Sequence, residues 1–231
     1  MRNLLLHMTL LFLSSMASYA SELACQIGSF EPVSTSLTPV FSKSGNIYYT
    51  DSNGHSIKIT QTNKDSSPVL SPNKKLIAFI RKSNKIIPES CDIDVKYGSE
   101  IWLYDLSTKK EKRLVKNNFE CDKPKKQIVD PRDLLFSPDN KTLYFMTAAW
   151  TTSGAVHGVY VDNSKERFII DGNGIEIVLK GDYSGYLIVN QHRYFIGGGS
   201  YDWYWLVNPN GKEEGPIGEE VTQDQMNFIE S

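Results

Sequence analysis

The sequence lacks the features that mark several large classes of protein. Its three cysteines, Cys25, Cys91 and Cys121, form no C-x-x-C pair, so their spacing does not favour a structural zinc site. Its 25 Lys and Arg are balanced by 27 Asp and Glu, which gives no basic footprint for binding nucleic acid. Beyond the first 20 residues, no stretch is apolar enough to span a membrane. What remains is an ordinary folded chain, in which 40% hydrophobic side chains are typical of a globular core.

Motifs of known catalytic chemistry are missing as well. There is no G-x-S-x-G, no P-loop and no G-x-G-x-x-G before a helix. The histidines at 55, 157 and 192 show no metal-ligand spacing with one another or with nearby acids, so we expect each to lie on the surface or in a turn. Asp92 and Asp94 lie in an acidic loop without the spacing of a calcium loop, so we interpret them as solvated. The sequence therefore predicts no catalytic residue, no metal and no cofactor, although it leaves enzymatic activity open.

The first 20 residues have the layout of a secretory signal peptide. Arg2 supplies a positive end, residues 4–13 are mostly apolar, and Ser18-Tyr19-Ala20 fits a small-x-small cleavage site. The apolar run is short for a membrane anchor, the alternative interpretation. We predict cleavage after Ala20, a single domain over 21–231, and a periplasmic or extracellular protein.

Export makes disulfide bonds possible. Cys91 and Cys121 both lie in polar, lysine-rich segments between apolar runs. A bond between them would close a loop of about 30 residues and stabilise the fold by roughly 3.5 kcal/mol in the chain-entropy model. Cys25 is then left either free or paired with another chain. The alternative is three reduced thiols.

The rest of the sequence is typical of short β-strands separated by turns. Asn53-Gly54 lies between two β-prone runs and predicts a hairpin, because both residues tolerate positive φ. We find no convincing amphipathic helix. Residues 219–231 are compatible with a helical turn, a strand or a loose tail.

Some of these segments repeat. Ser71-Pro72-Asn73 precedes the apolar run LIAFI, and Ser137-Pro138-Asp139 precedes TLYFM. Each unit continues into a second strand, IWLYD or GVYVD, and then through a polar turn into a third. Residues 41–60 form a shortened copy, and 181–217 a divergent one. Pro fixes φ and Asp or Asn bonds its own backbone, so each motif predicts a turn followed by an inner, buried strand.

These paired motifs resemble the TolB-type propeller repeat, a relative of the WD repeat. The resemblance implies an all-β fold, a small β-propeller or propeller-like array of antiparallel blades. At roughly 40–45 residues per blade, the 211 residues after the signal peptide give four to five blades. The repeat residues are structural, so the resemblance transfers no functional site. Segments 82–99 and 116–133 are insertions relative to the repeat.

An aromatic segment is the best candidate for binding. Tyr201, Trp203 and Trp205 alternate in a predicted strand, which places them on one face. We expect Tyr194 and Trp150 to add to this surface. Exposed Trp and Tyr anchor protein partners or stack on sugars. The alternative is that the stripe packs between blades, since one sequence does not distinguish a buried stripe from an exposed one.

These observations favour an exported, non-enzymatic protein-binding module, such as an assembly factor or an immunity-type inhibitor. Blade-top loops and the two insertions would contact the protein partner. One alternative is a carbohydrate-binding or carbohydrate-active propeller, in which Asp92, Asp94 or Asp182 would meet Trp150 or Trp203 in a pocket. Another is a structural subunit that completes a partner's ring or pairs with a second copy as a homodimer.

Overall fold

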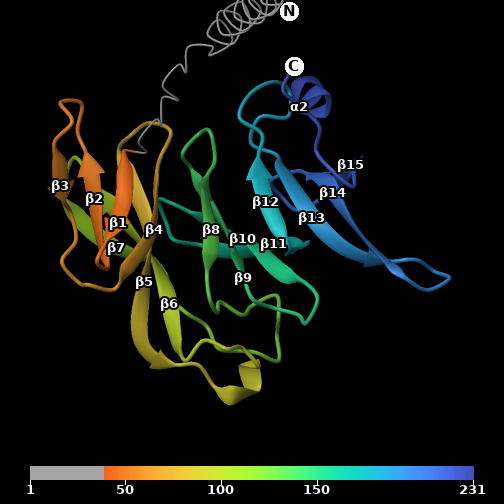
Figure 1. The fold of residues 1–231 in the computed structure, drawn as a ribbon, viewed down its shortest axis with the longest axis horizontal. Coiled ribbons are helices and arrows are strands. Elements are labelled where there is room, and N and C mark those ends of the chain that lie inside the picture. Colours follow the sequence, from red (N-terminus) through yellow and green to blue (C-terminus); the bar gives the residue numbers. More distant parts are fainter. Residues whose placement is uncertain (1–38) are drawn as a thin grey trace, which may run out of the picture. The chain divides into compact units, whose positions relative to one another are not determined.

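The computed structural model describes residues 39–231, which fold into antiparallel sheets and a short α-helix (Figure 1). The predicted signal peptide and Cys25 lie outside these residues. The first sheet has three strands: β1 (Val40–Lys43), β2 (Asn46–Thr50) and β3 (Ser56–Lys58). The second has four: β4 (Asp65–Leu70), β5 (Leu76–Ile86), β6 (Tyr97–Asp105) and β7 (Lys110–Val115).

The third and fourth sheets also have four strands each. The third contains β8 (Arg132–Phe136), β9 (Thr142–Thr147), β10 (Gly154–Tyr160) and β11 (Glu166–Gly172). The fourth contains β12 (Gly174–Ile177), β13 (Leu187–Tyr194), β14 (Ser200–Val207) and β15 (Glu213–Gly218). In every sheet each strand pairs antiparallel with the next in the chain. The predicted all-β, blade-like fold is confirmed.

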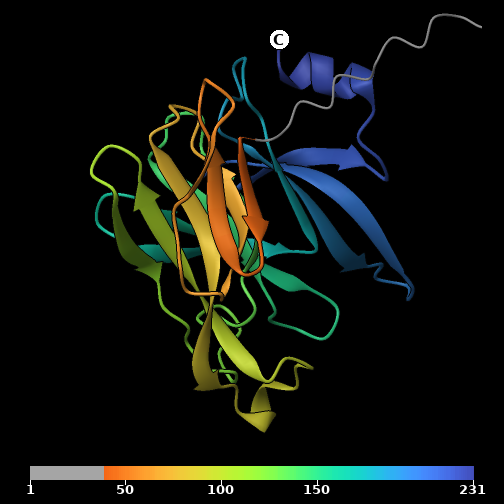
Figure 2. The same cartoon turned by 60° about the vertical axis from the view of Figure 1, so that its left-hand side comes forward.

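The sheets follow one another in chain order, from the orange first sheet to the blue fourth sheet (Figures 1 and 2). Their first strands make contacts between sheets: β1 with β4, β4 with β8, and β8 with β12. The strands after the Ser-Pro turns, β5 and β9, are second in their sheets. Each is therefore an inner strand of its sheet, and its apolar run is buried as predicted.

The two Ser-Pro turns have the same hydrogen bonds. The Ser71 hydroxyl accepts a hydrogen bond from the Leu76 amide at 2.9 Å, and the Ser137 hydroxyl accepts one from the Thr142 amide at 2.9 Å. Each hydroxyl donates to the residue two positions on, Asn73 at 2.7 Å or Asp139 at 2.6 Å. The Ser137 hydroxyl, helped by the backbone amide of residue 141, lowers the pKa of Asp139. These polar side chains hold each turn in one conformation, so the strands on either side stay in register.

The core is densest in the third sheet. All six residues of β9 are buried, as are six of the seven in β10. His157 of β10 is 0% exposed, and its ring lies against those of Phe145 and Phe168. Its Nδ1 is hydrogen-bonded to Glu166. The predicted surface or turn position of His157 is therefore wrong: it lies in a strand between β9 and β11 that is buried on both faces, at six of its seven positions.

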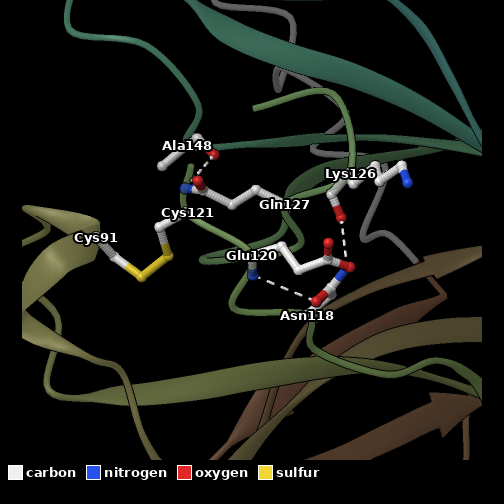
Figure 3. The surroundings of a disulfide bond; sticks show 7 residues. All are labelled: Cys91, Asn118, Glu120, Cys121, Lys126, Gln127 and Ala148. Atoms are coloured by element: carbon white, nitrogen blue, oxygen red, sulfur yellow. Dashed lines mark hydrogen bonds between the residues drawn. A yellow bond between two sulfur atoms is a disulfide. The ribbon is translucent and has the colours of Figure 1, made fainter. Parts of the chain in front are cut away.

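The two insertions meet at one end of the second and third sheets and are joined by a disulfide between Cys91 and Cys121 (Figure 3). The first insertion contains a 3₁₀ helix at Glu89–Cys91. Around the disulfide lies a small apolar cluster that includes Ile87, Phe119 and Val129. Gln127 ties the second insertion to the sheet, since its amide donates to the Ala148 carbonyl at 3.1 Å. The insertions therefore form a joint structure and are not two separate loops.

The segment whose structure the sequence left open contains α2 (Gln223–Ile229). Thr222 caps its first turn: its hydroxyl accepts from the Gln225 amide, and the Gln225 side chain accepts in return from the Thr222 amide. Ile229 is buried with Ile188 and Leu206 of the fourth sheet. The helix thereby covers the face of the fourth sheet that is turned away from the third.

Candidate functional site

The fourth sheet continues into a two-stranded ribbon, formed by 191–203. β12 pairs with β13 only over Leu187–Asn190, and β15 pairs with β14 only from Tyr204 onward. Beyond that point β13 and β14 pair with each other alone, from Gln191 opposite Trp203 to Tyr194 opposite Ser200. The ribbon leaves the four-stranded part of the sheet and extends to the lower right in Figure 1. Both edges of the ribbon are therefore unpaired by neighbouring strands.

The predicted alternation of Tyr201, Trp203 and Trp205 is present in β14. Trp205, within the four-stranded part, packs against the core between the third and fourth sheets. Tyr201 and Trp203 lie further out and are half-buried, with ring centroids 5.2 Å apart. The stripe therefore begins in the core and ends on the surface, so each of the two interpretations of the sequence describes one end of it.

The tip of the ribbon carries its most exposed apolar side chains. Tyr194 is 66% exposed, Phe195 57%, and Ile196 fully exposed. The chain turns back at Gly198 and Gly199, whose φ values of 94° and 85° suit glycine. The Phe195 ring packs on Tyr201 at 4.7 Å. Neighbouring rings thus support the tip, while its apolar surface stays in solvent.

Tyr194 and Trp150 do not join the stripe. Tyr194 is opposite Ser200 and so lies on the other face of the ribbon, with its ring 5.0 Å from that of His192. Trp150 lies between β9 and β10, and its ring meets Phe168 of β11 edge-on at 6.2 Å. The aromatic residues that we expected to form one surface therefore lie in three places. These are the stripe on β14, the opposite face of the ribbon, and the segment between β9 and β10.

Sequence reasoning missed Phe195 and Ile196. They stand immediately before the glycine-rich turn Gly197-Gly198-Gly199. An apolar pair beside a glycine-rich turn is a signal of an exposed tip, because a hairpin turn projects away from the core. Glu219 and Glu220 were missed too; they line a cleft of about 670 Å³ beside Trp203.

The fourth sheet and α2 also differ from the other sheets in charge. Residues 173–231 hold nine acidic and three basic side chains, a net charge of −6. Residues 39–172 hold 16 acidic and 21 basic side chains, a net charge of +5. The ribbon's own charges are largely paired, since His192 contacts Asp202 at 2.9 Å and Arg193 pairs with Glu213. The net charge of the whole chain is thus close to zero because two regions of opposite net charge nearly cancel.

Within residues 39–231, no group of three or more His, Cys, Asp or Glu side chains is arranged to hold a metal ion. In the same part of the chain, no helix has the length and apolar character needed to cross a membrane. The carboxylates beside Trp203 are Glu219 and Glu220, in place of the Asp92, Asp94 or Asp182 that the carbohydrate alternative required. The ribbon thus combines exposed apolar side chains at its tip with carboxylates near its base.

No family model and no curated protein matches the chain. Among solved structures, dipeptidyl peptidase 4 from Porphyromonas gingivalis matches with a TM-score of 0.54 and 12% identity, over 78% of this chain and 31% of the peptidase. The β-propeller domain of the Trilobed protease from Pyrococcus furiosus matches with a TM-score of 0.49 and 17% identity, over 77% and 50%. TolB from Acinetobacter baumannii matches with a TM-score of 0.47 and 18% identity, over 75% of this chain and 37% of TolB.

The chain thus spans about a third to a half of the length of these proteins. At such identities the likeness is one of fold alone. At that level the predicted TolB-like propeller repeat is confirmed.

Proposed function

We propose that the protein is an exported, non-enzymatic binding module that docks a protein partner on the aromatic ribbon of its fourth sheet. The observation that carries the proposal is the ribbon itself. A two-stranded hairpin without a covering layer is only marginally stable in water. Here such a hairpin holds Tyr194, Phe195 and Ile196 in solvent, where they contribute little to the fold. Large apolar side chains clustered on a projecting element are typical of a protein interface.

The disulfide supports the exported part of the proposal. Disulfides persist in oxidising compartments and are rare in the cytosol. The Cys91–Cys121 bond joins two insertions that the repeat does not require. Together with the signal-like residues 1–20, this favours a periplasmic or extracellular site of action. An assembly factor and an immunity-type inhibitor both fit such a module.

The experiment is affinity capture from a periplasmic extract with two forms of residues 21–231, the unaltered chain and Phe195→Ser/Ile196→Ser. We expect the unaltered chain to retain a partner that the double variant loses. The control is Ile86→Ser, which changes a side chain that is 62% exposed in the first insertion. Capture that is equal for the unaltered chain and the ribbon variant would contradict the proposal, as would loss of the partner in the Ile86 control.

A further inference from the structure

Two tryptophans of this fold already hold an arginine within the chain. The Arg81 guanidinium lies 4.4 Å from the centroid of the Trp102 ring and pairs with Asp65 at 2.6 Å and Glu111 at 2.8 Å. The Arg193 guanidinium lies 4.0 Å from the centroid of the Trp205 ring and pairs with Glu213. Each set combines an indole face with at least one carboxylate around one guanidinium, two for Arg81 and one for Arg193.

This combination is favourable for physical reasons. The negative face of an indole ring attracts a cation. A carboxylate at the side of the ring forms charge-assisted hydrogen bonds with the planar guanidinium. Because both groups act on the same cation, they also orient it. An arginine side chain is therefore the group that best fills a site built in this way.

Trp203 has the ring and the carboxylates but no such cation. It lines a cleft of about 670 Å³ with Glu219, Glu220 and Gln225. Both glutamates are exposed, and neither forms an ion pair within residues 39–231. In the same part of the chain, no Lys or Arg lies over the Trp203 ring. Trp203 is one step outward from Trp205 on the same face of β14, so the cleft lies at the base of the ribbon.

We propose that this cleft binds an arginine side chain of the protein that docks on the ribbon. The inference rests on the proposed function, and it adds the chemistry of the partner: a basic surface, with an arginine beside apolar side chains that meet Phe195 and Ile196. Charge complementarity supports it, since residues 173–231 carry a net charge of −6. An acidic surface of this kind attracts a basic protein and repels an acidic one.

The test uses ¹⁵N-labelled residues 21–231 and the probe Nα-acetyl-arginine amide, with the indole N–H signals of the four tryptophans observed by NMR. Trp203→Phe assigns the signal of Trp203. We expect that signal to shift saturably, while those of Trp102 and Trp205 stay fixed because their arginine positions are filled. Nα-acetyl-glutamine amide, which is neutral, should produce no shift.

The carboxylates are tested by Glu219→Gln/Glu220→Gln, which should weaken probe binding about tenfold if each contact is of the usual exposed strength. The matched control, Glu89→Gln/Asp92→Asn, makes the same change of net charge in the first insertion and should leave binding unchanged. An unmoved Trp203 signal, or equal affinity in the Glu219/Glu220 variant, would overturn the proposal.

This outcome is separable from that of the capture experiment. If the probe binds as expected but the unaltered chain and the Phe195→Ser/Ile196→Ser variant capture the partner equally, the proposed function fails and the arginine site stands. If capture depends on the ribbon and the probe leaves Trp203 unmoved, the arginine site fails and the function stands. Self-association that is lost in Glu219→Gln/Glu220→Gln would overturn an external partner and assign the cleft to a second copy.

Discussion

The third and fourth sheets have the same number of strands and the same strand order, yet they differ in how far their apolar side chains are buried. The central strand β9 of the third sheet is buried at all six positions. In the fourth sheet burial declines along β13 and β14 toward the tip of the ribbon, where Ile196 is fully exposed. The third sheet buries its apolar residues in the core, whereas the fourth sheet exposes some of its apolar residues to solvent. One repeat therefore contributes mainly to the core, whereas another leaves apolar side chains available for the partner that we propose.

The sharpest way to test this contrast is to shorten one phenylalanine in each sheet. Phe145 of β9 is 0% exposed, and Phe145→Ala should cost about 3–5 kcal/mol of unfolding free energy, because it leaves a cavity. Phe195→Ala at the ribbon tip should change stability by less than about 0.5 kcal/mol, as exposed positions usually do. Urea denaturation followed by circular dichroism measures both. Similar losses in the two variants would remove the distinction between scaffold and surface.

Removal of the disulfide should have a somewhat smaller effect on stability than Phe145→Ala. Cys91→Ser/Cys121→Ser should lower stability by about 3–4 kcal/mol, since the bond closes a long loop in the unfolded chain. The two cysteines are 30 residues apart, and both belong to the insertions of the second and third sheets. At temperatures where the variant is folded, partner capture by the ribbon should persist. Chemical denaturation, and capture below the transition, test the two halves of this prediction.

Much of the scaffold could be predicted from the sequence because its signals are local. The Ser-Pro turn carries its own hydrogen bonds around Ser71 and Ser137, so its residues specify the turn wherever they occur. The bridging of Cys91 to Cys121 could also be anticipated, from their shared setting between apolar runs.

The site depends on longer-range relations and was therefore harder to predict. Where β12 and β15 stop pairing decides which half of the β14 stripe is buried, and no residue within β14 reveals it. Likewise Glu219 meets Trp203 only because β15 returns beside β14. The burial of His157 and the separation of Trp150 from the ribbon were missed for the same reason.

The smallest effect concerns the turns that the sheets share. Asp139 in the Ser-Pro turn of the third sheet is an acid, whereas Asn73 at the corresponding turn of the second sheet is an amide that accepts from the Ser71 hydroxyl at 2.7 Å and from the Lys75 backbone amide at 3.1 Å. The Ser137 hydroxyl lowers the pKa of folded Asp139. Its contribution is therefore present above the unfolded pKa of about 3.9 and lost as the pH falls through the folded value.

Asp139→Asn should accordingly be slightly less stable than the unaltered chain at pH 7, with the gap closing as the pH falls below about 4 and through the lowered pKa of folded Asp139. Thermal unfolding followed across this range measures the gap. A gap that is constant with pH would show that the charge of Asp139 contributes nothing to the turn.

The central claim is that the ribbon serves binding and not folding. The most direct measurement replaces 192–202 with Asn-Gly, which joins Gln191 to Trp203 by a two-residue hairpin turn. The thermal midpoint and partner capture are then measured on the same preparation. We predict a midpoint within a few degrees of the unaltered chain and complete loss of the captured partner. An unfolded chain, or one that still retains the partner, would contradict the account.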